Sequence, residues 1–160
     1  MEEEIAAFMM KEAKFEFFLV NCDPNLAHTK DVRGLTVISG INWKALADYV
    51  EAKFPFKGFD FKLSGFKIFK DTAPQYLVLN KNGNLGWDSD DLSVDSWDQL
   101  LSRGFAQFRN NVAHGNKHHM AAPFTHERTR EFLAAAPVLI DFIASNVFDM
   151  PGWETPLMFR

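Results

Sequence analysis

Residues 96–115, SWDQLLSRGFAQFRNNVAHG, combine a regular apolar pattern with a polar end. At about 100° per residue, one stripe of a helix formed by this stretch is apolar: Trp97, Leu101, Phe105, Phe108 and Val112. Arg103, Asn110 and His114 fall on the opposite side, and Gly115 follows as a residue favoured just beyond helix ends. The stretch therefore predicts a helix that buries one face and presents arginine, amide and imidazole groups on the other.

Three further segments have the composition or periodicity of helices. Residues 2–20 contain no glycine or proline and begin with three acids, which the helix dipole favours at an N-terminus. Residues 41–54 and 125–147 carry apolar residues at helical spacing, and Pro137 is expected to kink the second of these helices. Together with residues 96–115, they predict a helical bundle.

The segments between these helices have weaker patterns. Residues 21–34 contain Asp-Pro, Asn and Gly and indicate a loop, whereas residues 55–69 are compatible with either a strand or irregular structure. Residues 76–87 place an Asn-Gly turn between two short apolar runs, which predicts a β-hairpin. We therefore expect one mainly α domain over residues 1–160, with a small β-hairpin-like insertion within residues 55–92, between the second and third helices.

Length and composition limit the class of protein. With 160 residues and 47% hydrophobic residues, the chain can bury one ordinary core. It begins MEEE rather than with a cationic signal, and it has no run of roughly 18 apolar residues, so we expect no membrane partner. Cys22 is the only cysteine, so an intrachain disulfide is excluded and we expect a buried thiol in a cytoplasmic protein.

Charge is unevenly distributed along the chain. The net charge of -4 gives no general argument for binding nucleic acid. Residues 101–130 nevertheless contain five Lys or Arg against one acid, Glu127, and four of the five histidines. Two interpretations are open, a solvated surface or a basic rim for an RNA backbone. The rim would comprise Arg103, Lys117, His118, His119, Arg128 and Arg130.

The polar face of residues 96–115 suits a particular chemistry. Histidine exchanges a proton near neutral pH, arginine binds phosphate oxygens, and an amide orients either group. These groups can support phosphoryl transfer on RNA without a metal, because the 2'-hydroxyl of the substrate serves as nucleophile. One histidine supplies one proton transfer, so a two-fold homodimer that joins two such faces would supply both base and acid.

A metal site is the alternative for the histidines. His114 and His118 are four residues apart, a spacing that metal ligands use on one helix face. Gly115 is expected to end the helix between them, and no carboxylate or cysteine joins the group before Glu127. We therefore expect no metal and no other cofactor.

Aromatic residues can fill a core or offer stacking surfaces to nucleobases. Because filling a core is the commoner role, seven rings are assigned to the core: Phe17, Phe18, Trp43, Trp97, Phe105, Phe108 and Phe124.

Residues 109–114, Arg-Asn-Asn-Val-Ala-His, resemble the R-polar-x-x-x-H motif of HEPN domains (higher eukaryotes and prokaryotes nucleotide-binding). As in that family, the motif stands at the expected end of a third helix, and the resemblance covers residues 96 to about 147. It implies a four-helix up-down bundle that dimerises, so that both motifs line one cleft, and that acts as a metal-independent endoribonuclease.

The resemblance also implies a role for each motif residue. Arg109 would bind the scissile phosphate, His114 would be the general base or acid, and Asn110 would orient them. Many proteins of this family are toxins of toxin-antitoxin or mobile-element defence systems, often paired with a nucleotidyltransferase-like antitoxin. Others lack the motif and act as binding modules, so a non-catalytic dimeric module for a protein or nucleotide is the alternative function.

Overall fold

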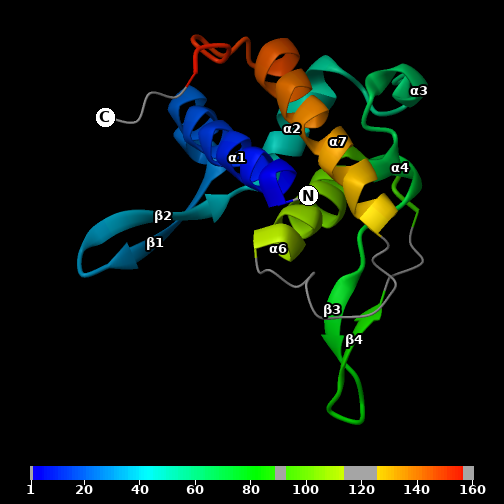
Figure 1. Cartoon of the computed structure of the whole chain (residues 1–160). Helices are drawn as coiled ribbons and strands as arrows, with labels where there is room; N and C mark the ends of the chain where they lie inside the picture. Colours follow the sequence, from blue (N-terminus) through cyan, green and yellow to red (C-terminus); the bar gives the residue numbers. More distant parts are fainter. Residues whose placement is uncertain (1, 89–92, 114–125, 157–160) are drawn as a thin grey trace.

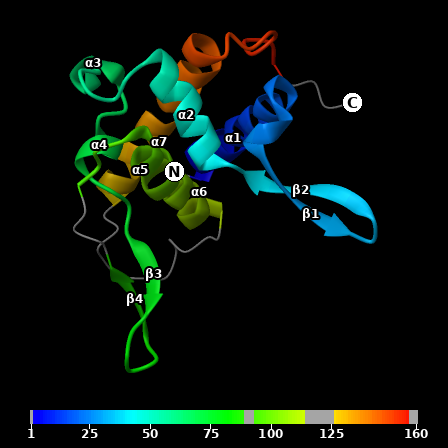
Figure 2. The same ribbon diagram turned by 180° about the vertical axis from the view of Figure 1, so that it is seen from behind.

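The computed structural model describes residues 2–88, 93–113 and 126–156, and only the backbone of residues 126 and 127. It is mainly helical, with two small antiparallel sheets (Figures 1 and 2). The main elements are α1 (Glu2–Cys22), β1 (Ala27–Val32), β2 (Leu35–Ile41), α2 (Trp43–Lys53), α3 (Phe61–Ser64), α4 (Ile68–Asp71), β3 (Tyr76–Leu79), β4 (Leu85–Asp88), α5 (Trp97–Gln99), η2 (Leu100–Phe105), α6 (Ala106–Ala113), α7 (His126–Phe142) and η3 (Ile143–Val147).

The helices predicted near residues 2–20 and 41–54 are confirmed as α1 and α2. α2 begins after Asn42, whose side-chain oxygen accepts a hydrogen bond from the Ala45 amide at 3.1 Å and so caps the first turn. Residues 55–69 form no strand; instead they contain the single-turn helix α3 and the beginning of α4.

The predicted third helix is present but is not uniformly α-helical. It begins at α5, passes through the π-helical segment η2, and continues as α6. The predicted apolar stripe is confirmed, since all five of its residues are buried: Trp97, Leu101, Phe105, Phe108 and Val112. Gly104 also faces the core, where a Cβ atom would lie 3.3 Å from the ring of Phe69. This glycine therefore lets α4 pack closely against η2.

The last predicted helix is confirmed as α7, which continues through Pro137 and is followed by the π-helical segment η3. α7 lies beside α1, as Figures 1 and 2 both show (yellow to orange and blue). Between these helices and α6, aromatic rings form much of the core: Phe108 lies 5.5 Å from Phe8 and 5.3 Å from Phe132, between ring centroids. Thr125, the predicted first residue of this helix, lies outside the described residues.

Two predictions about buried residues were wrong. Phe17 is 65% exposed, because it projects from α1 on the side away from the core residues Phe15 and Leu19. Cys22, at the end of the same helix, is exposed as well. Trp97, Phe105 and Phe108 are buried as predicted, Phe18 and Trp43 are partly buried against the core, and Phe124 lies outside the described residues.

Both hairpins project from the helical body, in different directions (Figures 1 and 2). The predicted hairpin is confirmed as β3–β4, with Gly83 at a φ of 76° in its turn. Residues 21–34 were wrongly predicted to be a loop: β1 begins within them and pairs with β2. The connecting turn places Arg33 and Gly34 at positive φ, 54° and 82°, and an Arg-Gly pair is a weaker turn signal than Asn-Gly.

Candidate functional site

The structure describes part of the predicted site. Arg109 and Asn110 lie in the middle of α6, which ends at Ala113. His114, the predicted acid-base group, follows immediately in the chain but lies outside the described residues, as do Lys117, His118 and His119. The geometry described below is therefore that of Arg109 and Asn110 and of the residues that contact them.

Arg109 is held by two carboxylates from α1. Its Nε donates a hydrogen bond to Glu12 Oε1 at 2.9 Å, and its Nη2 donates one to Glu16 Oε1, also at 2.9 Å. Glu12 and Glu16 are four residues apart and therefore lie on one face of α1. The guanidinium is thus fixed along one edge by the first helix, and its side chain remains 31% exposed.

Asn110 contacts the same guanidinium from the next position in the chain. Its side-chain oxygen accepts a hydrogen bond from Arg109 Nη1 at 3.2 Å. These described contacts use three of the five guanidinium N–H groups, which leaves two for a ligand. The predicted role of Asn110 in orienting Arg109 is compatible with this arrangement.

Glu12 is an acid inside the apolar core. Its side chain is 3% exposed, and the residues that share its face of α1 are Phe8, Phe15 and Leu19. Burial, a hydrogen bond with Glu16 and the negative charge of Glu16 together raise the pKa of Glu12 to about 8, although Arg109 acts in the opposite direction. Glu12 therefore takes up a proton more readily than an ordinary glutamate. The cluster around Arg109 is thus sensitive to pH.

Asn111, the next residue of the motif, has a structural role. It is 2% exposed, its amide nitrogen donates to the Gln75 carbonyl at 3.0 Å, and its oxygen accepts from Gln107 Nε2 at 2.8 Å. The bond to Gln75 connects α6 to the segment that leads into β3, and the bond from Gln107 lies within α6. Both polar ends of the side chain are thereby satisfied inside the fold.

The predicted RNA-binding cations that the structure describes do not form one cluster around Arg109. Arg103 is half-buried in η2, and Arg130 is exposed on α7. Arg128 is half-buried, donates from Nη2 to the Ala73 carbonyl at 3.1 Å, and lies over the ring of Phe132. These three cations are therefore spread over η2 and α7.

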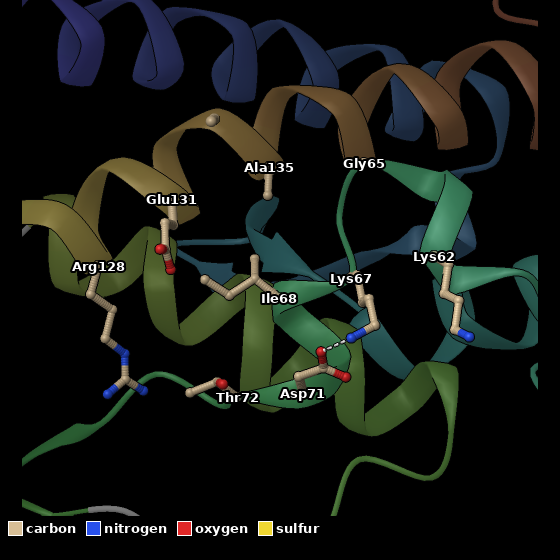
Figure 3. Close-up of a pocket in the computed structure, with 10 residues that line it drawn as sticks. Lys62, Gly65, Lys67, Ile68, Asp71, Thr72, Arg128, Glu131 and Ala135 are labelled. Carbon is tan, nitrogen blue, oxygen red and sulfur yellow. Dashed lines mark hydrogen bonds and ion pairs between the residues drawn. The ribbon is translucent and has the colours of Figure 1, made fainter.

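Arg128 instead borders a hollow of about 810 Å³ between α4 and α7. Figure 3 shows Arg128 at one end of this hollow and Lys62 at the other, with Ile68 between them. Lys67 also lines the hollow and forms an ion pair with Asp71. The sequence did not predict this surface, because Lys62 and Lys67 come from the segment of uncertain structure before the third helix.

The described residues were searched for metal-binding clusters and for membrane-spanning helices. Among residues 2–88, 93–113 and 128–156, His, Cys, Asp and Glu side chains form no group of three or more that could hold a metal ion. His114 and its neighbouring histidines are outside that search. In the same part of the chain, every helix is too short or too polar to cross a bilayer.

Glu12 and Glu16 were not predicted as site residues. One signal was present: Glu12 follows Phe8 at a spacing of four and precedes Leu19 at a spacing of seven, so it falls within the apolar stripe of α1. An acid in such a position requires a buried partner. The partner, Arg109, lies 97 residues away from Glu12, so local patterns could not identify it.

The chain was also compared with known proteins. No family model, curated protein or solved structure matches it.

Proposed function

We propose that this protein is a HEPN-type, metal-independent endoribonuclease in which Arg109 binds the scissile phosphate of RNA. In this proposal Asn110 orients the guanidinium, and His114 transfers the proton to or from the reacting oxygen. The observation that supports it best is the placement of Arg109, five residues before His114 in the chain: two acids and an amide fix its guanidinium, while part of the side chain stays exposed. A fixed, partly exposed guanidinium is suited to a phosphate whose charge grows in the transition state.

The proposed reaction needs two proton transfers. We infer a two-fold homodimer in which helices α1, α2, α6 and α7 act as a four-helix up-down bundle and the two motifs share a cleft. The histidine of one protomer would then remove the 2'-hydroxyl proton while that of the other protonates the leaving 5'-oxygen. A toxin role with a nucleotidyltransferase-like antitoxin is the biological setting that the resemblance suggests.

A second candidate function has its own supporting observation. The ion pairs of Arg109 lie within one chain, an arrangement that also serves to connect α6 to α1. If that were the only role of Arg109, the protein would be a non-catalytic binding module for a protein or nucleotide.

Cleavage of a single-stranded RNA in the presence of a chelator distinguishes the two functions. The nuclease proposal predicts cleavage by the wild type and a loss on the order of 10²-fold in His114→Ala, because a proton transfer is removed. His28→Ala, which changes a histidine on β1, is the matched control and should retain full activity. Equal rates in the wild type and His114→Ala would assign the cleavage to a contaminant and favour the binding module.

A further inference from the structure

A hollow of about 530 Å³ lies between α1 and β2, next to Arg109. Phe17 and Asn21 line it from α1, Ile38 and Ser39 line it from β2, and Arg109 and Glu16 line its polar side. Its volume is within the range of roughly 300–1,000 Å³ that small-molecule sites occupy. The hollow is therefore large enough for one nucleobase with its sugar.

Phe17 gives this hollow an exposed aromatic ring. It is 65% exposed, whereas most other phenylalanines of α1 and α6 are buried or partly buried. Its described ring contact is with the neighbouring Phe18, edge-on at 6.0 Å between centroids. An exposed ring of this kind can stack on the face of a base of any sequence.

The polar groups of the hollow include hydrogen-bond acceptors. The amide nitrogen of Asn21 donates one hydrogen bond to the Phe17 carbonyl at 2.7 Å, so Asn21 can offer its side-chain oxygen and its second N–H to a ligand. The Glu16 carboxylate accepts from Arg109 and is hydrogen-bonded to Glu12, and its two oxygens have further lone pairs for a ligand. Carboxylate and amide oxygens accept hydrogen bonds from the exocyclic amino groups of adenine, cytosine and guanine, and uracil has no such group.

Ser39 adds one adaptable group. The strand pairing passes from His28↔Gly40 to Thr29↔Ile38, so Ser39 is the extra residue of a β-bulge and lies outside the ladder pairs. Bulges redirect a side chain from the regular alternation of a strand. The Ser39 hydroxyl can act as donor or acceptor toward a base edge.

From this geometry we propose that the hollow binds the nucleobase next to the scissile phosphate, with the base stacked on Phe17 and its amino group at Glu16 and Asn21. This inference rests on the proposed function, because Arg109 connects the two sites by binding the phosphate of the same nucleotide. The substrate class is single-stranded RNA with an amino-bearing base, adenine, cytosine or guanine, in preference to uracil. Glu16 then has two roles, since it holds Arg109 and selects the base.

Equilibrium binding of RNA that cannot be cleaved tests the hollow separately from catalysis. The probes are single-stranded oligonucleotides with 2'-O-methyl groups, of poly-A, poly-C and poly-U sequence, titrated at constant salt by fluorescence anisotropy. The wild type should bind the A and C probes about 10-fold more tightly than the U probe. Phe17→Ala should weaken binding of the A probe about 10-fold, whereas Phe17→Tyr, which keeps a ring, should retain it.

Leu63→Ala is the control for loss of an exposed apolar side chain: Leu63 is 85% exposed on α3 and should be replaceable without effect. Equal binding of the A probe by the wild type and Phe17→Ala would overturn the base site, even if cleavage that depends on His114 is found. Conversely, binding that depends on Phe17 without any cleavage would retain the base site and reject the nuclease. If Phe17→Ala instead converts a dimer into a monomer by light scattering, this face is a protein interface and the base site is wrong.

Discussion

Arg109 and Lys67 are both cations paired with carboxylates at the edge of a hollow, but their surroundings differ. Arg109 contacts the buried acid Glu12, whereas Lys67 pairs with Asp71 on one helical surface where both side chains are almost half exposed. Water and salt screen an exposed pair, so it contributes little and can exchange partners easily. A pair with a buried acid holds the guanidinium in one orientation, and its strength depends on whether the acid is protonated. Under the proposed function, Arg109 would orient a single phosphate, and the surface around Lys67 would attract the RNA backbone in general.

The largest expected effect follows from replacing Arg109. Arg109→Ala should lower the rate of RNA cleavage on the order of 10²-fold, because the developing phosphate charge loses its fixed partner. Asn110→Ala should cost less, since the α1 carboxylates still hold the guanidinium. Rates at saturating RNA measure both effects, and thermal melts monitor folding.

Arg33→Ala, at the turn between β1 and β2, controls for the loss of an exposed arginine. If folded Arg109→Ala cleaves RNA as fast as this control, Arg109 is only a structural link between α1 and α6.

The second effect concerns pH. In the folded state the pKa of Glu12 is about 8, above its ordinary value of 4.5, so the fold binds this proton more tightly than the unfolded chain does. The stabilisation is fully present below pH 4.5 and is lost as the pH rises through 8. Within this window it changes the free energy of unfolding by at most about 1.4 kcal/mol per pH unit. Glu12→Gln should remove this slope in urea titrations between pH 5 and 9.

Glu3→Gln changes an exposed acid of the same helix and should leave the slope of the wild type intact. Equal slopes in the wild type and Glu12→Gln would show that another group takes up the proton.

The smallest effect is expected at the hollow between α4 and α7. Changing Lys62 and Lys67 to Ala together should weaken RNA binding a few-fold and lower the slope of log affinity against log salt by at most about 1.4, or roughly 0.7 for each phosphate contact. Cleavage at saturating RNA should be unchanged, because neither residue touches the motif. A loss of cleavage as large as that of Arg109→Ala would mean that this hollow, rather than the α1–α6 cluster, contains the reactive site.

The sequence predicts the helices and the β3–β4 turn better than it predicts the contacts between elements. The buried stripe from Trp97 to Val112 follows from helical periodicity, and the β3–β4 turn follows from the Asn-Gly pair at residues 82 and 83. β1 was missed because its residues are mostly polar and exposed, so no apolar alternation marks it. Phe17 was assigned to the core because its apolar character alone does not indicate which face of α1 it occupies.

The carboxylates around Arg109 show a different limit. The motif at residues 109–114 is local in sequence and could be found by spacing, but its partners Glu12 and Glu16 belong to the first helix. Only tertiary packing of α1 against α6 brings them together. The sequence thus predicts which residue types are available for chemistry, and the packing determines how Arg109 is oriented.

The most direct test of the central claim is the chemistry of the cleaved RNA ends. The account predicts that the wild type, in the presence of a chelator, leaves 2',3'-cyclic phosphate ends and that a single 2'-deoxy nucleotide at the cleavage site blocks the cut, because the 2'-hydroxyl is the nucleophile. Mass spectrometry of the products measures the first outcome, and gel analysis of the substituted RNA measures the second. Ends with a 3'-hydroxyl, or unchanged cleavage of the 2'-deoxy substrate, would contradict the account.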